Sequence, residues 1–162
     1  MVQHRIIYTH PGDGMVKILT PAYKTYQTDE EIERKVIAQS VPDGATHRLV
    51  TESEYEAEVE ACAGRVFRDV WGDVGGALTV NMTKARELHM NRIRVVRDAE
   101  LVKKDVLFMR AIEAEDTDAQ ATIKTEKQTL RDIPATFDIT TDVSTPAALH
   151  AKWPSELPAR EL

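Results

Sequence analysis

The residues best suited to metal binding or acid–base chemistry are five histidines, spread along the 162-residue chain as His4, His10, His47, His89 and His150. No two of them stand three or four residues apart, the spacing that lets two imidazoles on one helix face bind zinc. Cys62 is the only cysteine, which excludes an internal disulfide and a zinc site of several thiolates. The sequence therefore predicts no metal, no cofactor and a reducing compartment. His89 is expected to pack beside a long helix, with a ligand or acid–base role as the alternative.

Carboxylates alternate along a short acidic segment, at Glu52, Glu54, Glu56, Glu58 and Glu60. On a helix these side chains would spread around the axis, and on a strand they would line one face. Neither geometry isolates a pair of carboxyl groups in different environments, as general acid–base catalysis requires. We expect a solvated loop or short helix that links two modules, with weak calcium binding as the alternative.

The glycine-rich segment 72–76 is a further candidate for a ligand site. A strand-like segment follows it, rather than a Lys-Ser/Thr pair and a helix, so it is predicted to be a tight turn and not a phosphate-binding loop. No serine lies in the strand–turn–helix context of a nucleophile elbow. The chain is therefore not expected to be an enzyme.

Charge is unevenly distributed in this chain of net charge -6: residues 28–60 carry ten acidic and three basic residues, and residues 81–112 carry eight basic and four acidic ones. The basic cluster comprises Lys84, Arg86, Arg92, Arg94 and Arg97. A basic helix can follow phosphates, but no aromatic side chains are interleaved here to stack on bases, which argues against nucleic-acid binding. Pairing with acidic residues of a partner, or of the first module, is favoured. The asymmetry also allows copies of the chain to associate head to tail.

Residues 1–64 are predicted to form a small β-β-α-β module. Two strands at 4–9 and 15–20 flank the turn residues Pro11-Gly12-Asp13-Gly14. Thr28 and Glu31 form a capping-box pattern at the start of a helix, which ends before Pro42. A third strand is expected at 47–51.

Residues 65–162 are predicted to form a short β-hairpin, then a long antiparallel helical hairpin and a short C-terminal helix. The hairpin strands are expected at 66–71 and 77–80, and the long helix at 82–115, which contains no Gly and no Pro. A second helix at 119–133 ends at Pro134, and Thr145 caps a short helix that begins at Pro146. The whole chain is thus predicted to be α+β, with module boundaries at 1–64 and 65–162.

The long helix carries an apolar side chain at every seventh position, at Leu88, Val95, Val102 and Met109. Ala85, Ala99 and Val106 occupy the interleaved positions, which Arg92 interrupts, so the pattern is heptad-like. We expect the shorter helix to cover the C-terminal half of this stripe, including Val102, Val106 and Met109, as internal core. The N-terminal half is then left for the β-module, a second copy or another protein.

Two groups of motifs resemble bacteriophage tail proteins. The run Lys127–Pro134, Lys-Gln-Thr-Leu-Arg-Asp-Ile-Pro, followed by Trp153-Pro154, resembles the C-terminal region of phage tail-fibre assembly and tail assembly chaperone proteins. The elements Phe67-Arg68, Trp71, Gly75-Gly76 and Met82–Arg86 look like small proteins encoded among prophage tail genes. The resemblance covers roughly residues 65–155. In the chaperones aromatic residues precede the Leu-Arg run, where this chain has residues 125–127, Thr-Glu-Lys.

The resemblance implies a tail or tail-fibre assembly factor that acts by binding protein in the host cytoplasm. One alternative is a minor structural component of the tail or baseplate that stays in the virion, and another is a nucleic-acid-associated or host-modulating phage protein. The expected partner is a tail or tail-fibre protein, with a homo-oligomer as a further possibility. No apolar run reaches the roughly 18–20 residues of a membrane span, so no membrane is expected. The candidate partner-binding residues are Leu88, Arg92, Arg94, Val95, Leu130, Ile133 and Trp153.

Overall fold

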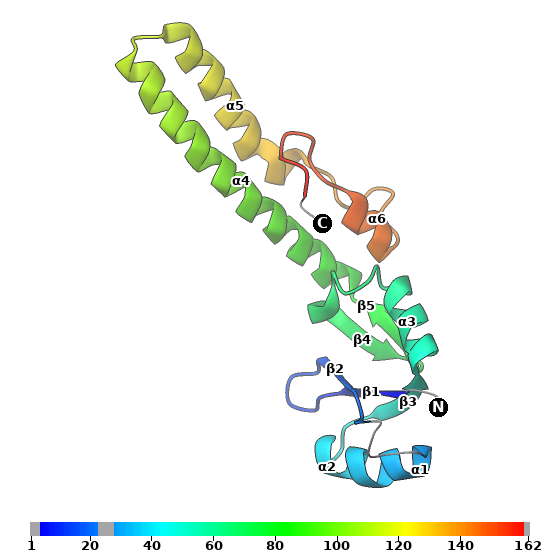
Figure 1. Cartoon of the computed structure of the whole chain (residues 1–162). Helices are drawn as coiled ribbons and strands as arrows, with labels where there is room; N and C mark the ends of the chain where they lie inside the picture. Colours follow the sequence, from blue (N-terminus) through cyan, green and yellow to red (C-terminus); the bar gives the residue numbers. More distant parts are fainter. Residues whose placement is uncertain (1–3, 23–27, 161–162) are drawn as a thin grey trace. The chain divides into compact units, whose positions relative to one another are not determined.

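The computed structural model describes residues 4–22 and 28–160 and has the predicted α+β fold (Figure 1). The chain divides into two compact units, residues 1–85 and residues 86–162, with the boundary in the first turn of the long helix. Each unit has its own hydrophobic core, and the two are described in turn.

The first unit begins with the predicted β-β-α-β arrangement. Three strands, β1 (His4–Thr9), β2 (Val16–Leu19) and β3 (His47–Thr51), form an antiparallel sheet in the order β2-β1-β3. The central strand β1 pairs Ile7 with Ile18 on one side and with Arg48 on the other. Ile6 and Ile7 point to opposite faces of the sheet and both are completely buried, so both faces of β1 are covered.

A helical segment connects β2 to β3 and begins where the sequence predicts. The Glu31 N–H donates to the Thr28 hydroxyl oxygen at 3.2 Å, which satisfies one of the free donors of the first turn. The segment consists of α1 (Asp29–Glu31), a π-helical stretch (Ile32–Ile37) and α2 (Ala38–Ser40). Ile32 is buried, and the extended Val41 before Pro42 ends the segment.

The acidic segment after β3 is a helix, α3 (Glu52–Ala61), with a complete capping box. Thr51 accepts from the Glu54 N–H at 3.2 Å, and the Glu54 carboxylate accepts from the Thr51 N–H at 2.8 Å. The short-helix form of the prediction is therefore confirmed. A solvated linker is wrong, because Tyr55 is buried in the core of the unit.

The second hairpin is present but shifted from its predicted position. Residues 66–70, expected as a strand, contain a short 3₁₀ turn (Arg68–Val70), and β4 covers only Trp71–Val74. It pairs antiparallel with β5 (Ala77–Val80). The turn between them uses Gly75 and Gly76 at φ 64° and 81°, a conformation that side chains with a Cβ rarely adopt.

One cluster forms the core of the first unit and contains residues from both sides of the predicted boundary at residue 64: Ile7, Val16, Val50, Tyr55, Cys62, Trp71 and Leu78. Arg48 ties the same elements together with ionic contacts. It donates to Glu58 of α3 at 2.8 Å and to Asp73 of β4 at 3.1 Å. Burial opposes ionisation of Glu58, but hydrogen bonds from Arg48 and from the Leu78 N–H outweigh it, and its pKa is lowered. This acidic residue is thus a structural partner and not a solvated one.

The second unit is the predicted helical hairpin with a short final helix. The helix α4 (Met82–Glu113) is followed by α5 (Thr117–Thr136), which returns antiparallel along its C-terminal half, and by α6 (Pro146–Ala151) (Figure 1). Asp116 caps α5 by accepting from the Ala119 N–H at 2.9 Å. The predicted Thr145 cap of α6 is also present, accepting from the Ala148 N–H at 3.1 Å.

Pro134 does not end α5, contrary to the prediction. The helix continues through Thr136, so the proline lies in its last turn. The hydrogen bonding of this turn is kept after the proline, because the Phe137 N–H donates to the Ile133 carbonyl at 2.8 Å. The core of this unit contains residues from α4, α5 and the C-terminal segment: Met90, Ile93, Leu130, Ile133 and Leu157. Across residues 4–22 and 28–160, none of the helices combines the length and the apolar character needed to cross a membrane.

Candidate protein-binding site on helix α4

The inner face of α4 is the one that packs within the second unit. Ile93 is completely buried and Ala111, near the far end, is 7% exposed. Polar contacts close the seam with α5: Lys104 bonds Glu126 at 2.7 Å, Lys127 pairs with Asp105, and the Gln120 amide donates to the Ala111 carbonyl at 3.2 Å. The inner face therefore has its partners within the chain.

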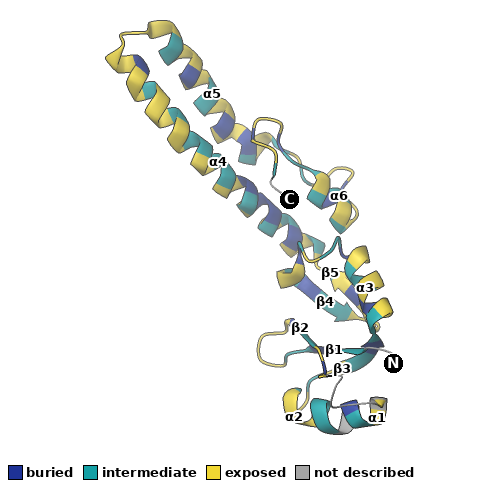
Figure 2. Ribbon diagram, in the orientation of Figure 1, coloured by how far each residue is buried: buried dark blue, intermediate teal, exposed yellow. Residues whose placement is uncertain are grey.

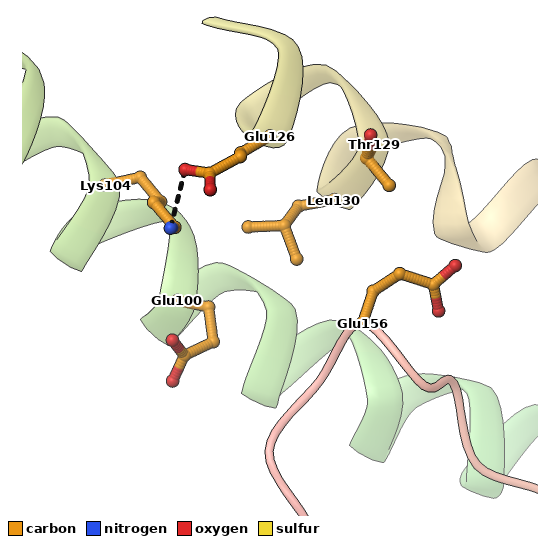
Figure 3. Close-up of a pocket in the computed structure, with 6 residues that line it drawn as sticks. All are labelled: Glu100, Lys104, Glu126, Thr129, Leu130 and Glu156. Atoms are coloured by element: carbon orange, nitrogen blue, oxygen red, sulfur yellow. Dashed lines mark hydrogen bonds and ion pairs between the residues drawn. The ribbon is translucent and has the colours of Figure 1, made fainter. Parts of the chain in front are cut away.

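A pocket of about 230 Å³ interrupts this seam, where α4, α5 and the C-terminal segment meet. Figure 3 shows Leu130 at its centre, with Glu100, Glu126 and Glu156 around it. Lys104 reaches the Glu126 carboxylate across the gap. No metal-binding group of three or more His, Cys, Asp or Glu side chains is found here, or elsewhere in the described parts of the chain.

The outer face of α4 carries an exposed apolar stripe, which we define as Val95, Ala99, Val102, Val106 and Met109. The exposed fraction is 70% for Val95, 63% for Val102, 49% for Val106 and 56% for Met109. Figure 2 shows exposed positions along the side of α4 turned away from α5. The prediction that α5 covers Val102, Val106 and Met109 as core is therefore wrong.

Helix geometry explains why the stripe and the core separate. Successive residues are rotated by about 100°, so residues two apart point to nearly opposite sides. Ile93 and Val95 are such a pair, one completely buried and the other 70% exposed. The stripe repeats every three to four residues from Val95 to Met109, and it keeps to the side opposite Ile93 throughout.

Charged residues border the stripe on both edges. Asp98 and Asp105 lie along one edge, and Lys103 and Arg110 lie along the other. Their side chains extend into solvent, with exposed fractions of 62% for Asp98, 59% for Asp105 and 68% for Lys103. The α4 surface is thus an apolar ridge with one acidic and one basic border.

The structure brings two of the predicted partner-binding residues, Arg92 and Trp153, together in a groove of about 520 Å³. The charged residues that line this groove are all basic, and Lys103 and Arg160 are among them. The Arg160 guanidinium lies over the Trp153 ring, 4.9 Å from its centroid. The Trp153 indole N–H donates to the Pro158 carbonyl at 2.9 Å, which holds the C-terminal segment in place.

His89 lies at the base of this groove and is completely buried, the packing role that the sequence predicts. Its Nε2 is 2.7 Å from the Lys152 carbonyl oxygen, and its ring meets Trp153 edge to face. Burial lowers the pKa of His89, although its hydrogen bond to Lys152 favours the charged form, and the nearby Arg160 lowers it further. The imidazole therefore holds the C-terminal segment against α4 in its neutral form.

The other predicted partner-binding residues lie in different environments. Val95 is the most exposed member of the stripe, and Leu88, about two turns nearer the start of α4, is half-buried. Leu130 and Ile133 are 5% and 3% exposed and belong to the core, so they offer no surface to a partner. Arg94 is exposed and bonds Asn91 at 2.8 Å. Sequence reasoning missed the charged borders of the stripe, although their seven-residue spacing was present as a signal.

The arginines of α4 do not form one basic face. Three of them donate within the chain: Arg86 to the Val143 carbonyl at 2.9 Å, Arg94 to Asn91 at 2.8 Å and Arg97 to Asp98 at 2.8 Å. At about 100° per residue these three arginines lie on one side of α4, whereas Arg92 and Arg110 lie on the opposite side. The arginines are therefore divided between two sides of the helix, and Arg86, Arg94 and Arg97 bond other residues of the chain.

Comparison with known protein families, with curated proteins and with solved structures finds no match to this chain.

Proposed function

We propose that this protein is a bacteriophage tail or tail-fibre assembly factor that acts by binding protein rather than by catalysis, and that the exposed stripe on α4 is its binding surface. The observation that carries the proposal is the exposure of four large apolar side chains along one face of a well-packed helix. Contiguous apolar surface bordered by charges is typical of protein interaction sites.

The choice of a phage tail rests on the resemblance of Lys127–Pro134 and Trp153-Pro154 to tail assembly chaperones. In this chain Leu130, Ile133 and Trp153 pack in or against the core of the second unit. They support the helical hairpin that presents α4, so the protein-binding role is assigned to the opposite face of α4. The chaperone-like motif thus stabilises the hairpin, and the stripe binds the partner.

The proposal is tested by capturing the chain's partners from cells that produce the encoding phage. Affinity-tagged wild-type protein is compared with Val102→Glu, which places a charge in the centre of the stripe. Thr122→Glu is the matched control, since Thr122 is an exposed position on α5. A tail or tail-fibre polypeptide bound by wild type and Thr122→Glu, and lost from Val102→Glu, supports the proposal. Capture of the same polypeptide by the wild type and both variants, or of no tail polypeptide by any of the three proteins, contradicts it.

A structural tail component is the second candidate, because the two charged borders of the stripe suit a permanent interface between ordered subunits. Quantitative mass spectrometry of purified phage particles separates the two roles. A fixed copy number per particle supports the structural component. Absence from particles, combined with abundance in the infected cell, supports the assembly factor.

A further inference from the structure

We infer that the α4 stripe pairs in parallel with the same stripe of a second copy of this chain. The inference deepens the proposed function, since it takes the stripe to be a protein-binding surface and names a partner for it. It rests on the heptad register of the stripe and on the placement of charge along its two borders.

The stripe has the register of a coiled-coil seam. With Val95, Val102 and Met109 at the d positions, Ala99 and Val106 fall at the a positions between them. The spacing alternates four and three residues without a break from Val95 to Met109. A seam of this kind is completed by an identical helix, whose a and d side chains fill the spaces between its own.

The charged borders determine the direction of the partner helix. In this register Asp98 and Asp105 occupy g positions, and Lys103 and Arg110 occupy e positions. A parallel helix brings each g residue beside the e residue five positions further along its partner. Asp98 then faces Lys103 of the second copy and Asp105 faces Arg110, and symmetry repeats both pairs. An antiparallel helix would instead bring acid against acid and base against base.

The border side chains remain accessible to a second copy. Lys103 bonds Glu100 at 2.6 Å yet is 68% exposed, and Asp105 pairs with Lys127 yet is 59% exposed. An ammonium group has three donors and a carboxylate accepts at two oxygens, so each can hold a further partner.

The seam is short, which makes the association reversible. Arg92, the a position before Val95, lines the groove with Trp153, and Glu113 places a carboxylate at the a position after Met109. Only about two heptads are therefore apolar, and isolated helical pairs of that length are weak. Self-association would cover the stripe in the free protein, and a tail polypeptide would compete with the second copy for it.

Sedimentation velocity of the purified full chain tests the inference across a concentration series reaching about 100 µM, the range in which weak interfaces dissociate. We expect the wild type to shift from monomer to a dimer or larger oligomer over this series. Asp98→Lys/Asp105→Lys makes both borders basic, and Lys103→Asp/Arg110→Asp makes both acidic. Each variant alone should self-associate at least about tenfold more weakly, and an equimolar mixture should recover the association. The matched control, Asp118→Lys/Asp132→Lys, changes two exposed aspartates of α5 and should behave as wild type.

A disulfide tests the parallel register even if the charge variants fold poorly. Val95→Cys, at one end of the stripe, is placed in a Cys62→Ser background and oxidised gently. In a parallel in-register pair the two position-95 side chains are adjacent across the seam, within the Cα separation of about 4.4–6.8 Å that a disulfide spans. An antiparallel pair would place them at opposite ends of the stripe. Rapid formation of a covalent dimer supports the inference. A wild-type chain that stays monomeric, a mixture that does not recover, or no covalent dimer overturns it.

The outcomes also separate this inference from the proposed function. A monomeric protein that still captures a tail polypeptide through the stripe overturns only the pairing with a second copy. A protein that self-associates as described but captures no tail polypeptide overturns only the assembly role.

Discussion

The two faces of α4 carry similar side chains and have different environments. Ile93 on the inner face is completely buried, whereas Val95, two residues later, is 70% exposed. Both faces follow the three- and four-residue spacing of an amphipathic helix. The difference shows that apolar periodicity predicts only that a helix packs against something. How much of the helix is covered within the chain depends on the length and position of the other elements.

Among single substitutions, the largest loss in the free energy of unfolding is expected on the inner face of α4. Ile93→Ala should lower the free energy of unfolding by about 2–5 kcal/mol, because it removes buried methyl groups and leaves a cavity beside Leu130 and Ile133. Urea denaturation followed by circular dichroism measures the change. A loss below about 0.5 kcal/mol, typical of surface sites, would mean that Ile93 is not core.

A partly buried ionic cluster and an exposed ion pair are also expected to differ in their contributions to stability. Arg48 is 17% exposed and bonds Glu58 and Asp73. Arg48→Ala should lower the free energy of unfolding by about 2–3 kcal/mol, because two partly buried carboxylates lose their partner. Replacing Lys103, which is 68% exposed and paired with its neighbour Glu100, should cost at most about 0.5 kcal/mol. Denaturation of both alanine variants at neutral pH checks this order. Equal losses would show that the Arg48 cluster is solvated.

A smaller effect is expected from the buried imidazole on the inner side of α4. Burial holds the pKa of His89 in the folded protein below its usual 6.5. Between these two pKa values the unfolded chain therefore binds more protons than the folded one. The stabilising contribution of neutral His89 should be complete above pH 6.5. It should decline as the pH falls below that value toward the folded pKa. His89→Asn, which keeps a donor for the Lys152 carbonyl, should be less stable overall but show a shallower decline between about pH 7.5 and 5.5. Identical slopes in the two proteins would assign the dependence to other groups, such as His150, whose pKa is also lowered by burial.

The smallest effect on stability is expected on the outer face. Val102→Ser should change the free energy of unfolding by less than about 0.5 kcal/mol when it is measured near 1 µM, where self-association is negligible. The reason is that Val102 is already 63% exposed. A loss similar to that of Ile93→Ala would contradict the division of α4 into two faces.

Local chemistry made much of the fold predictable. The strands around Ile7 and Val50, the Thr28 and Thr145 caps and the uninterrupted helix after Met82 all follow from turn residues, caps and periodicity, and the structure contains each of them. The errors have non-local causes. Arg48 draws Glu58 into the first unit, and a sequence pattern cannot indicate such a contact between distant residues.

The candidate site was predicted only in part. The seven-residue repeat identified Val95 and Val102 as one stripe, but it gave no way to decide that α5 packs against Ile93 and not against Val102. Leu130 and Ile133 were assigned to a partner because their motif resembles a chaperone, although a helix that must stabilise a hairpin also needs them as core. The missing information is which of two apolar faces a short helix selects, and tertiary packing decides this.

The measurement that tests the central claim most directly is the thiol reactivity of Val102→Cys in a Cys62→Ser background. Ala121→Cys, an exposed position on α5, is the matched control in the same background. If the stripe is a protein-binding surface, the thiol at position 102 reacts with maleimide as fast as the control in dilute protein. It becomes protected when protein concentration rises or a tail polypeptide is added, while the control does not. A thiol that is protected even in dilute protein would show that Val102 is core. A thiol that stays fully reactive under every condition would show that nothing binds the stripe.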